Sequence, residues 1–76
     1  MKMTIREITN KYEGYALVVC DTDDCYWDRV AENKWSACGE ISWYATDAEI
    51  EACGIGSVEV YEDECMVCII VNSSLS

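Results

Sequence analysis

Two kinds of side chain in this sequence could do chemistry, thiols and carboxylates, and the thiols come first. Cys65 and Cys68 have the C-x-x-C spacing of a zinc ligand pair, and Cys20 and Cys25 could supply a second pair. On a regular strand, however, residues three apart point to opposite faces, and this motif lies inside an apolar run. We therefore expect mostly buried, reduced thiols and no metal or cofactor. A disulfide and a cysteine-ligated metal-binding mini-domain stay open as alternatives.

Carboxylates dominate the charge of the chain. Fifteen Asp and Glu residues face five Lys and Arg residues, so the net charge is −10. From Trp35 onward the chain holds eight acids and no base. Such a surface repels nucleic acid and anionic membranes and attracts basic protein surfaces. The alternative is that the acids only keep an apolar mini-protein soluble.

The acids that could act together lie in two short stretches. Alternate residues on one side of a strand are about 7 Å apart, and residues four apart on a helix are about 6 Å apart. Carboxylates at such spacing can imitate a phosphate backbone toward a protein that binds nucleic acid through Lys and Arg. A solvated acidic face is the alternative. We predict that the partner-binding residues are Glu62, Asp63 and Glu64, helped by Asp47, Glu49, Glu51 and Glu59.

Aromatic side chains close to these acids would favour the binding interpretation, because aromatic residues anchor protein interfaces. The candidates are Trp35, Trp43, Tyr44 and Tyr61. The competing interpretation is that most of them belong to the core.

Catalysis is not expected. The chain has no His, so it lacks the usual general base and the commonest metal ligand. Paired carboxylates are too frequent to be informative, and no nucleophile with its base and no phosphate loop stands out. We predict that the protein is not an enzyme.

The main acidic stretch would be held by a hairpin over residues 57–71. Val58 and Val60 alternate with polar residues, which is the period of a half-buried strand. Residues 65–71 are all apolar and rich in β-branched types, which predicts a strand covered on both faces. The acids between these strands cannot be buried and so mark the turn. Residues 72–76 are expected to be a frayed tail.

The second acidic stretch lies on the one predicted helix. Thr46 and Glu49 have the spacing of a capping box, in which each side chain accepts a hydrogen bond from the backbone of the other. Apolar residues continue this helix to Cys53, and Gly54 sits where a glycine commonly ends a helix. Acids near the start of the helix are favoured by its dipole.

The other elements are strands. Residues 25–31 fit either a strand or a helix, and the Asp-rich loop before them and a turn at Asn33 favour the strand. Gly39 would interrupt the sheet. The remaining strands are expected over residues 3–10, 15–21, 34–38 and 40–45.

Together these elements predict one domain over residues 1–76. Its class is α+β, a mostly antiparallel sheet (a meander and a C-terminal hairpin) with one short helix. The start of the chain lacks the apolar stretch of a signal peptide, and no run approaches the roughly 20 apolar residues of a membrane span. We therefore expect a cytoplasmic protein, monomeric or dimeric, that binds neither membrane nor nucleic acid directly.

In size and charge the whole chain resembles small phage-encoded inhibitors of host defence, such as anti-CRISPR proteins and nucleic-acid mimics. The resemblance implies a stoichiometric inhibitor in the cytoplasm of a bacterial host. Such an inhibitor would sit in the basic channel of an RNA-guided nuclease complex and exclude its target DNA. The alternative is an acidic protein-interaction or accessory module without mimicry, which could dimerise through an exposed sheet edge.

Overall fold

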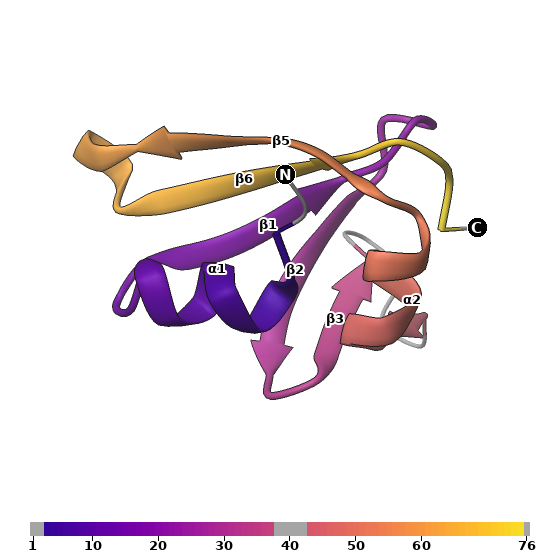
Figure 1. Cartoon of the computed structure of the whole chain (residues 1–76), viewed down its shortest axis with the longest axis horizontal. Coiled ribbons are helices and arrows are strands. Elements are labelled where there is room, and N and C mark those ends of the chain that lie inside the picture. The colour runs from indigo at the N-terminus through magenta and orange to yellow at the C-terminus, as the bar shows by residue number, and fades with distance from the viewer. Residues whose placement is uncertain (1–2, 38–42, 76) are drawn as a thin grey trace.

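Six strands form one sheet, and the helices pack against one of its faces (Figure 1). The computed structural model describes residues 3–37 and 43–75. In chain order the elements are α1 (Ile5–Lys11), β1 (Ala16–Cys20), β2 (Tyr26–Ala31), β3 (Lys34–Ala37), β4 (Tyr44–Ala45), α2 (Asp47–Ala52), β5 (Ile55–Tyr61), the 3₁₀ turn η1 (Glu62–Glu64) and β6 (Met66–Val71).

The strand order is β4-β3-β2-β1-β6-β5, and all neighbours are antiparallel except β1 and β6. Strands β1 to β4 form a meander, and β5 and β6 form a hairpin. The hairpin joins the meander because β6 runs parallel to β1, with Ala16 opposite Met66 and Cys20 opposite Ile70. The predicted α+β class with a mostly antiparallel sheet is confirmed.

Helix α1 corrects the strand predicted over residues 3–10. Thr4 and Glu7 make a second capping box, in which the Thr4 hydroxyl accepts from the Glu7 amide and Glu7 accepts from the Thr4 amide. Ile5 and Ile8, three residues apart, then lie on one face and are fully buried. The described part of the chain therefore has two α-helices instead of the expected one.

The other element boundaries largely follow the prediction. Residues 26–31 form a strand, because β2 pairs with β1 on one side and β3 on the other. Helix α2 begins after Thr46 with the expected capping box. The predicted break at Gly39 and the start of the strand over 40–45 lie outside the described residues, and β4 covers only Tyr44 and Ala45 of that range.

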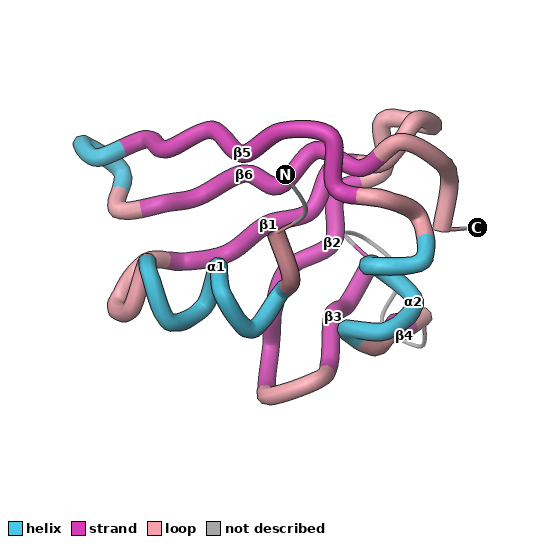
Figure 2. The backbone as a smooth tube through the Cα atoms, in the orientation of Figure 1, coloured by secondary structure: helices cyan, strands magenta, loops and turns pink. Residues whose placement is uncertain are grey.

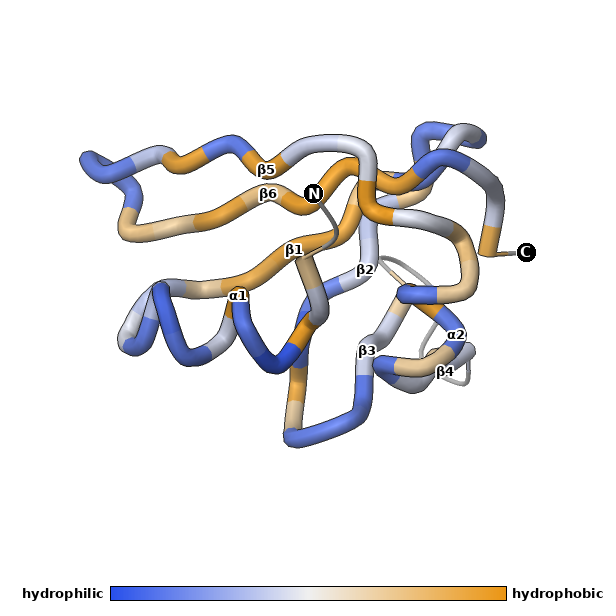
Figure 3. The backbone as a smooth tube through the Cα atoms, viewed as in Figure 1, coloured by the Kyte–Doolittle hydropathy of each residue, from blue (hydrophilic) through white to orange (hydrophobic). Residues whose placement is uncertain are grey.

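The core lies between the sheet and the two helices. Ile5, Ile8 and Ile50 from the helices meet Trp27 and Trp35 from the sheet, and all five are buried. Along β6, buried and half-buried residues alternate, so this strand is covered on one face and not on both as its apolar run suggests. Figure 3 shows how strongly apolar β1 and β6 are. The second face of the sheet is therefore apolar at its centre and open.

The tail corrects a further prediction, since residues 72–75 dock on the domain instead of fraying. The Asn72 amide donates to the Gly54 carbonyl at 2.8 Å. The Ser74 hydroxyl donates to Asp23 at 2.5 Å, and the Leu75 amide donates to Asp21 Oδ2 at 3.2 Å. These contacts tie the end of the described chain to the loop between β1 and β2.

Candidate functional site

The densest acids lie at the end of the β5–β6 hairpin, as predicted, where η1 forms the turn (Figure 2). Cys65 closes this turn with a left-handed backbone, φ 53° and ψ 46°. Glu62, Asp63 and Glu64 are all exposed. Glu62 accepts a hydrogen bond from the Tyr15 hydroxyl at 3.2 Å. Asp63 and Glu64 make no side-chain hydrogen bond or ion pair with any described residue.

Glu59 belongs to this hairpin but is partly engaged. Its Oε1 accepts from the Tyr61 hydroxyl at 2.6 Å, and this bond and the carboxylate charge raise the pKa of Tyr61 above its ordinary value. The same effect of Glu62 raises the pKa of Tyr15. Both phenols therefore stay protonated and donate at neutral pH.

The acids of α2 lie at the other end of the molecule and have intramolecular partners (Figure 1). Asp47 Oδ1 accepts from Trp35 Nε1 at 2.7 Å. Glu49 completes the capping box of Thr46, and Glu51 Oε2 accepts from the Ile5 amide at 2.9 Å. Glu51 thereby supplies the first turn of α1 with a negative acceptor, which the helix dipole favours. The structure therefore does not bring the two predicted groups of acids into one patch.

Asp21 is a carboxylate whose role sequence analysis misses. It is buried, and its two oxygens accept from the amides of Asp23, Cys25 and Leu75 and from Trp27 Nε1. Burial alone would raise the pKa of Asp21, but these hydrogen bonds outweigh it and lower the pKa below its ordinary value. Asp21 thus organises the β1–β2 loop as a charged acceptor. Its place in an Asp-rich loop is the only signal in the sequence.

The four zinc candidates are not brought together. Cys65 lies at the hairpin turn, where its thiol donates to the Gly14 carbonyl, and Cys25 packs against the core. Cys20 and Cys68 lie on neighbouring strands on the open face, and both are half-buried. Within residues 3–37 and 43–75 no three Cys, Asp or Glu side chains are placed to hold a metal ion, and the five cysteines there are free thiols.

The open face of the sheet carries a groove of about 530 Å³ that crosses β2, β1, β6 and β5. Its floor is apolar, and partly exposed aromatic and acidic side chains stand at its two ends. Burial raises the pKa of the floor thiol Cys68, so this residue is uncharged at neutral pH. The lining residues are Val18, Tyr26, Asp28, Tyr61, Glu64, Met66 and Cys68.

Of the aromatic anchors considered from the sequence, Trp35 is core, whereas Trp43, Tyr44 and Tyr61 are 43–46% exposed. Tyr26, which sequence analysis does not single out, is the most exposed of all at 51%. Lys34 Nζ lies 4.3 Å from the centroid of the Tyr44 ring. The open face therefore already holds one cation against one of its aromatic rings.

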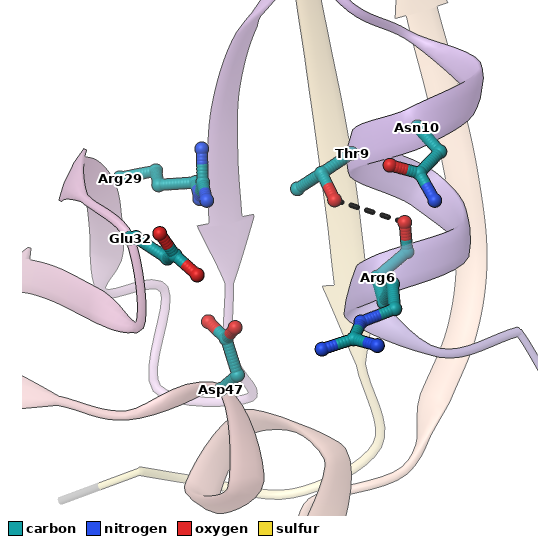
Figure 4. Close-up of a pocket in the computed structure, with 6 residues that line it drawn as sticks. All are labelled: Arg6, Thr9, Asn10, Arg29, Glu32 and Asp47. Atoms are coloured by element: carbon teal, nitrogen blue, oxygen red, sulfur yellow. Dashed lines mark hydrogen bonds between the residues drawn. The ribbon is translucent and has the colours of Figure 1, made fainter.

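A polar pocket of about 490 Å³ lies on the helix side (Figure 4). Arg6 reaches it from α1 and Arg29 from β2, with the carboxylate of Glu32 beside Arg29 and that of Asp47 at the start of α2. The Nε of Arg29 is the one buried side-chain nitrogen or oxygen in the described part of the chain that lacks a hydrogen-bond partner. Two positive and two negative groups balance here, so the pocket does not select a ligand by net charge.

No family model, curated protein or solved structure matches this chain. Among the described residues there is no helix with the length and apolar character needed to cross a membrane.

Proposed function

We propose that this protein is a small acidic binding protein that docks on a basic, nucleic-acid-binding surface of another protein and blocks it stoichiometrically, without catalysis. The observation that carries the proposal is the exposed hairpin end, where Asp63 and Glu64 have no partner among the described residues. Neighbouring Glu62 and Glu59 add charge to the same end of the molecule.

Unpaired carboxylates at an exposed turn suit this role for two reasons. They can form charge-assisted hydrogen bonds with Lys and Arg without giving up an existing bond. The net charge of −10 also steers a positive partner toward the protein and raises the association rate. A row of carboxylates can replace phosphates in a basic channel, and an RNA-guided nuclease complex is one partner with such a channel. An anti-CRISPR role is the specific form of this proposal.

The partner can be identified by affinity capture from a bacterial lysate, followed by a competition assay on the captured protein. We expect the wild-type protein to displace DNA or RNA from this partner at an equimolar ratio. A partner that holds its nucleic acid and this protein together contradicts mimicry. That outcome would leave acidic recognition by an accessory module as the function.

A matched pair of variants tests the site. Asp63→Asn with Glu64→Gln should weaken binding to the captured partner by about tenfold, with most of the loss in the association rate at low salt. The control, Asp24→Asn with Glu32→Gln, removes the same charge from two other exposed acids whose side chains also make no hydrogen bond or ion pair with described residues. Equal losses from the two pairs would show that net charge alone matters and that the hairpin end is not the site.

A further inference from the structure

The groove on the open sheet face has a chemistry of its own. Val18, Met66 and Cys68 form an apolar floor on strands β1 and β6, where Val18 is the register partner of Cys68. Tyr26 and Asp28 stand at the β2 end, and Tyr61 and Glu64 stand at the other. From β2 to β5 there are three strand spacings, about 14 Å in all. The groove is thus long, apolar below, and aromatic and acidic at both ends.

This arrangement is the complement of a lysine or arginine side chain. These side chains have an apolar stem that gains from lying on apolar surface and a charged head that stays at the rim. The side chains of Asp28 and Glu64 make no hydrogen bond or ion pair with any described residue, so their carboxylates are available to such a head. The rings of Tyr26 and Tyr61 can add cation–π attraction. No Lys or Arg of the described chain lines the groove.

We propose that this groove binds the lysine or arginine side chains of the partner protein, with their stems across Val18, Met66 and Cys68 and their heads at Asp28 and Glu64. The inference rests on the proposed function, because it names the part of a basic surface that the protein recognises. Two other occupants are disfavoured by charge. A second copy would bring acidic rims together, and nucleic acid would be repelled by the net charge of −10.

Two short synthetic peptides test whether the apolar stem of lysine contributes to binding. Attraction between charges alone does not depend on the length of that stem. In one peptide lysine alternates with glycine, and in the other 2,4-diaminobutyric acid, which has two fewer methylene groups, replaces lysine. At a slightly acidic pH both carry the same charge. The lysine peptide should bind about tenfold more tightly in a calorimetric titration, because each lysine stem covers more apolar floor. Equal affinities would contradict the proposed binding in the groove. They would not contradict the proposed function, which depends on the acidic hairpin end. No binding of either peptide at low salt would contradict both.

Two uncharged substitutions test the location. Tyr26→Thr should lower the affinity for the lysine peptide about two- to fivefold, because the aromatic ring is lost. Tyr44→Thr, made on the same face but outside the groove and at 46% exposure against 51%, should leave its affinity unchanged. Methyl NMR gives an independent measurement, in which Met66 should shift on adding the peptide while Met3, which packs on the helix side, should not. Equal effects of the two Tyr substitutions, or an unmoved Met66 signal, would overturn the proposal.

Discussion

Two regions of this protein use their acids differently, and the sequence does not distinguish them. Asp21 and the acids of α2 accept hydrogen bonds from backbone amides and from the indoles of Trp27 and Trp35. At the hairpin end, Asp63 and Glu64 accept none from described residues. The same residue types therefore have different roles. One group holds loops and helices in place, and the other is free to meet a partner.

This difference teaches that net charge is a poor guide to function until the partners of each carboxylate are known. An acid that satisfies buried or helix-terminal donors stabilises the fold, and removing it leaves those donors unpaired. An exposed acid without partners only adds to repulsion between like charges. Four measurements of stability test this distinction between the two regions.

The largest effect is expected at Asp21. Asp21→Asn keeps the shape but removes the charge and one acceptor oxygen from a site with four donors, so the free energy of unfolding should fall by about 1–3 kcal/mol. Urea unfolding measures this. Asp24→Asn in the same loop is the control, and it should be nearly neutral because Asp24 is exposed and Asn tolerates its positive φ of 59°.

The pH dependence of the free energy of unfolding is a second test of the role of Asp21. Because the folded pKa of Asp21 is lowered, its contribution is fully present above the unfolded pKa of about 3.9. The contribution is lost as the pH falls through the folded value. The difference in unfolding free energy between wild type and Asp21→Asn should therefore be constant near neutral pH and shrink in acid. A difference that grows in acid would contradict the assigned hydrogen bonds.

A smaller effect on stability is expected when an acid of α2 is compared with an acid of the hairpin end. Asp47→Ala should cost about 1–2 kcal/mol, because it leaves the indole N–H of buried Trp35 without its acceptor. Asp63→Ala, which removes the same side chain at the hairpin end, should change stability by less than about 0.5 kcal/mol. Equal costs would mean that the hairpin acids are also structural, and the distinction between the regions would fail.

The smallest effect on stability is expected from repulsion between the exposed carboxylates. In the wild type, salt should raise the melting temperature between low and moderate NaCl, since screening relieves like charges within a Debye length of roughly 8–10 Å. Neutralising Asp63 and Glu64 together should stabilise the protein by a few tenths of a kcal/mol at low salt, and this gain should vanish as salt is added. A loss of stability in the double variant would show that these acids have partners in the folded state.

Local signals in the sequence are enough for part of this fold. The capping box at Thr46 and the alternation in β5 identify α2 and the hairpin. The same capping spacing occurs at Thr4, yet the alternation of Met3 and Ile5 suggests a strand there, and only packing of Ile5 and Ile8 against the sheet decides for a helix. Residues 25–31 are ambiguous locally, and pairing with two neighbouring strands resolves them.

The candidate site is less predictable than the fold because it depends on which face each strand presents. The turn at Glu62 to Glu64 follows from its charge alone. The groove does not, because Val18, Tyr26 and Met66 come together only when β6 pairs with β1. Likewise, nothing local distinguishes Asp21 from the exposed acids beside it. It is buried where residues 72–75 return to the β1–β2 loop and the Leu75 amide donates to it.

The parallel pairing of β1 with β6 has a consequence for how the protein folds. Strands β1 and β6 place residue 16 opposite residue 66, so their pairing closes a loop that contains most of the chain. Closing a loop of this length costs entropy before any contact is gained, and folds rich in such distant pairings form slowly. The β1–β4 meander alone leaves one side of β1 without hydrogen bonds. The sheet therefore stays incomplete until β6 has been synthesised, and this domain is expected to fold only after β6 has emerged from the ribosome.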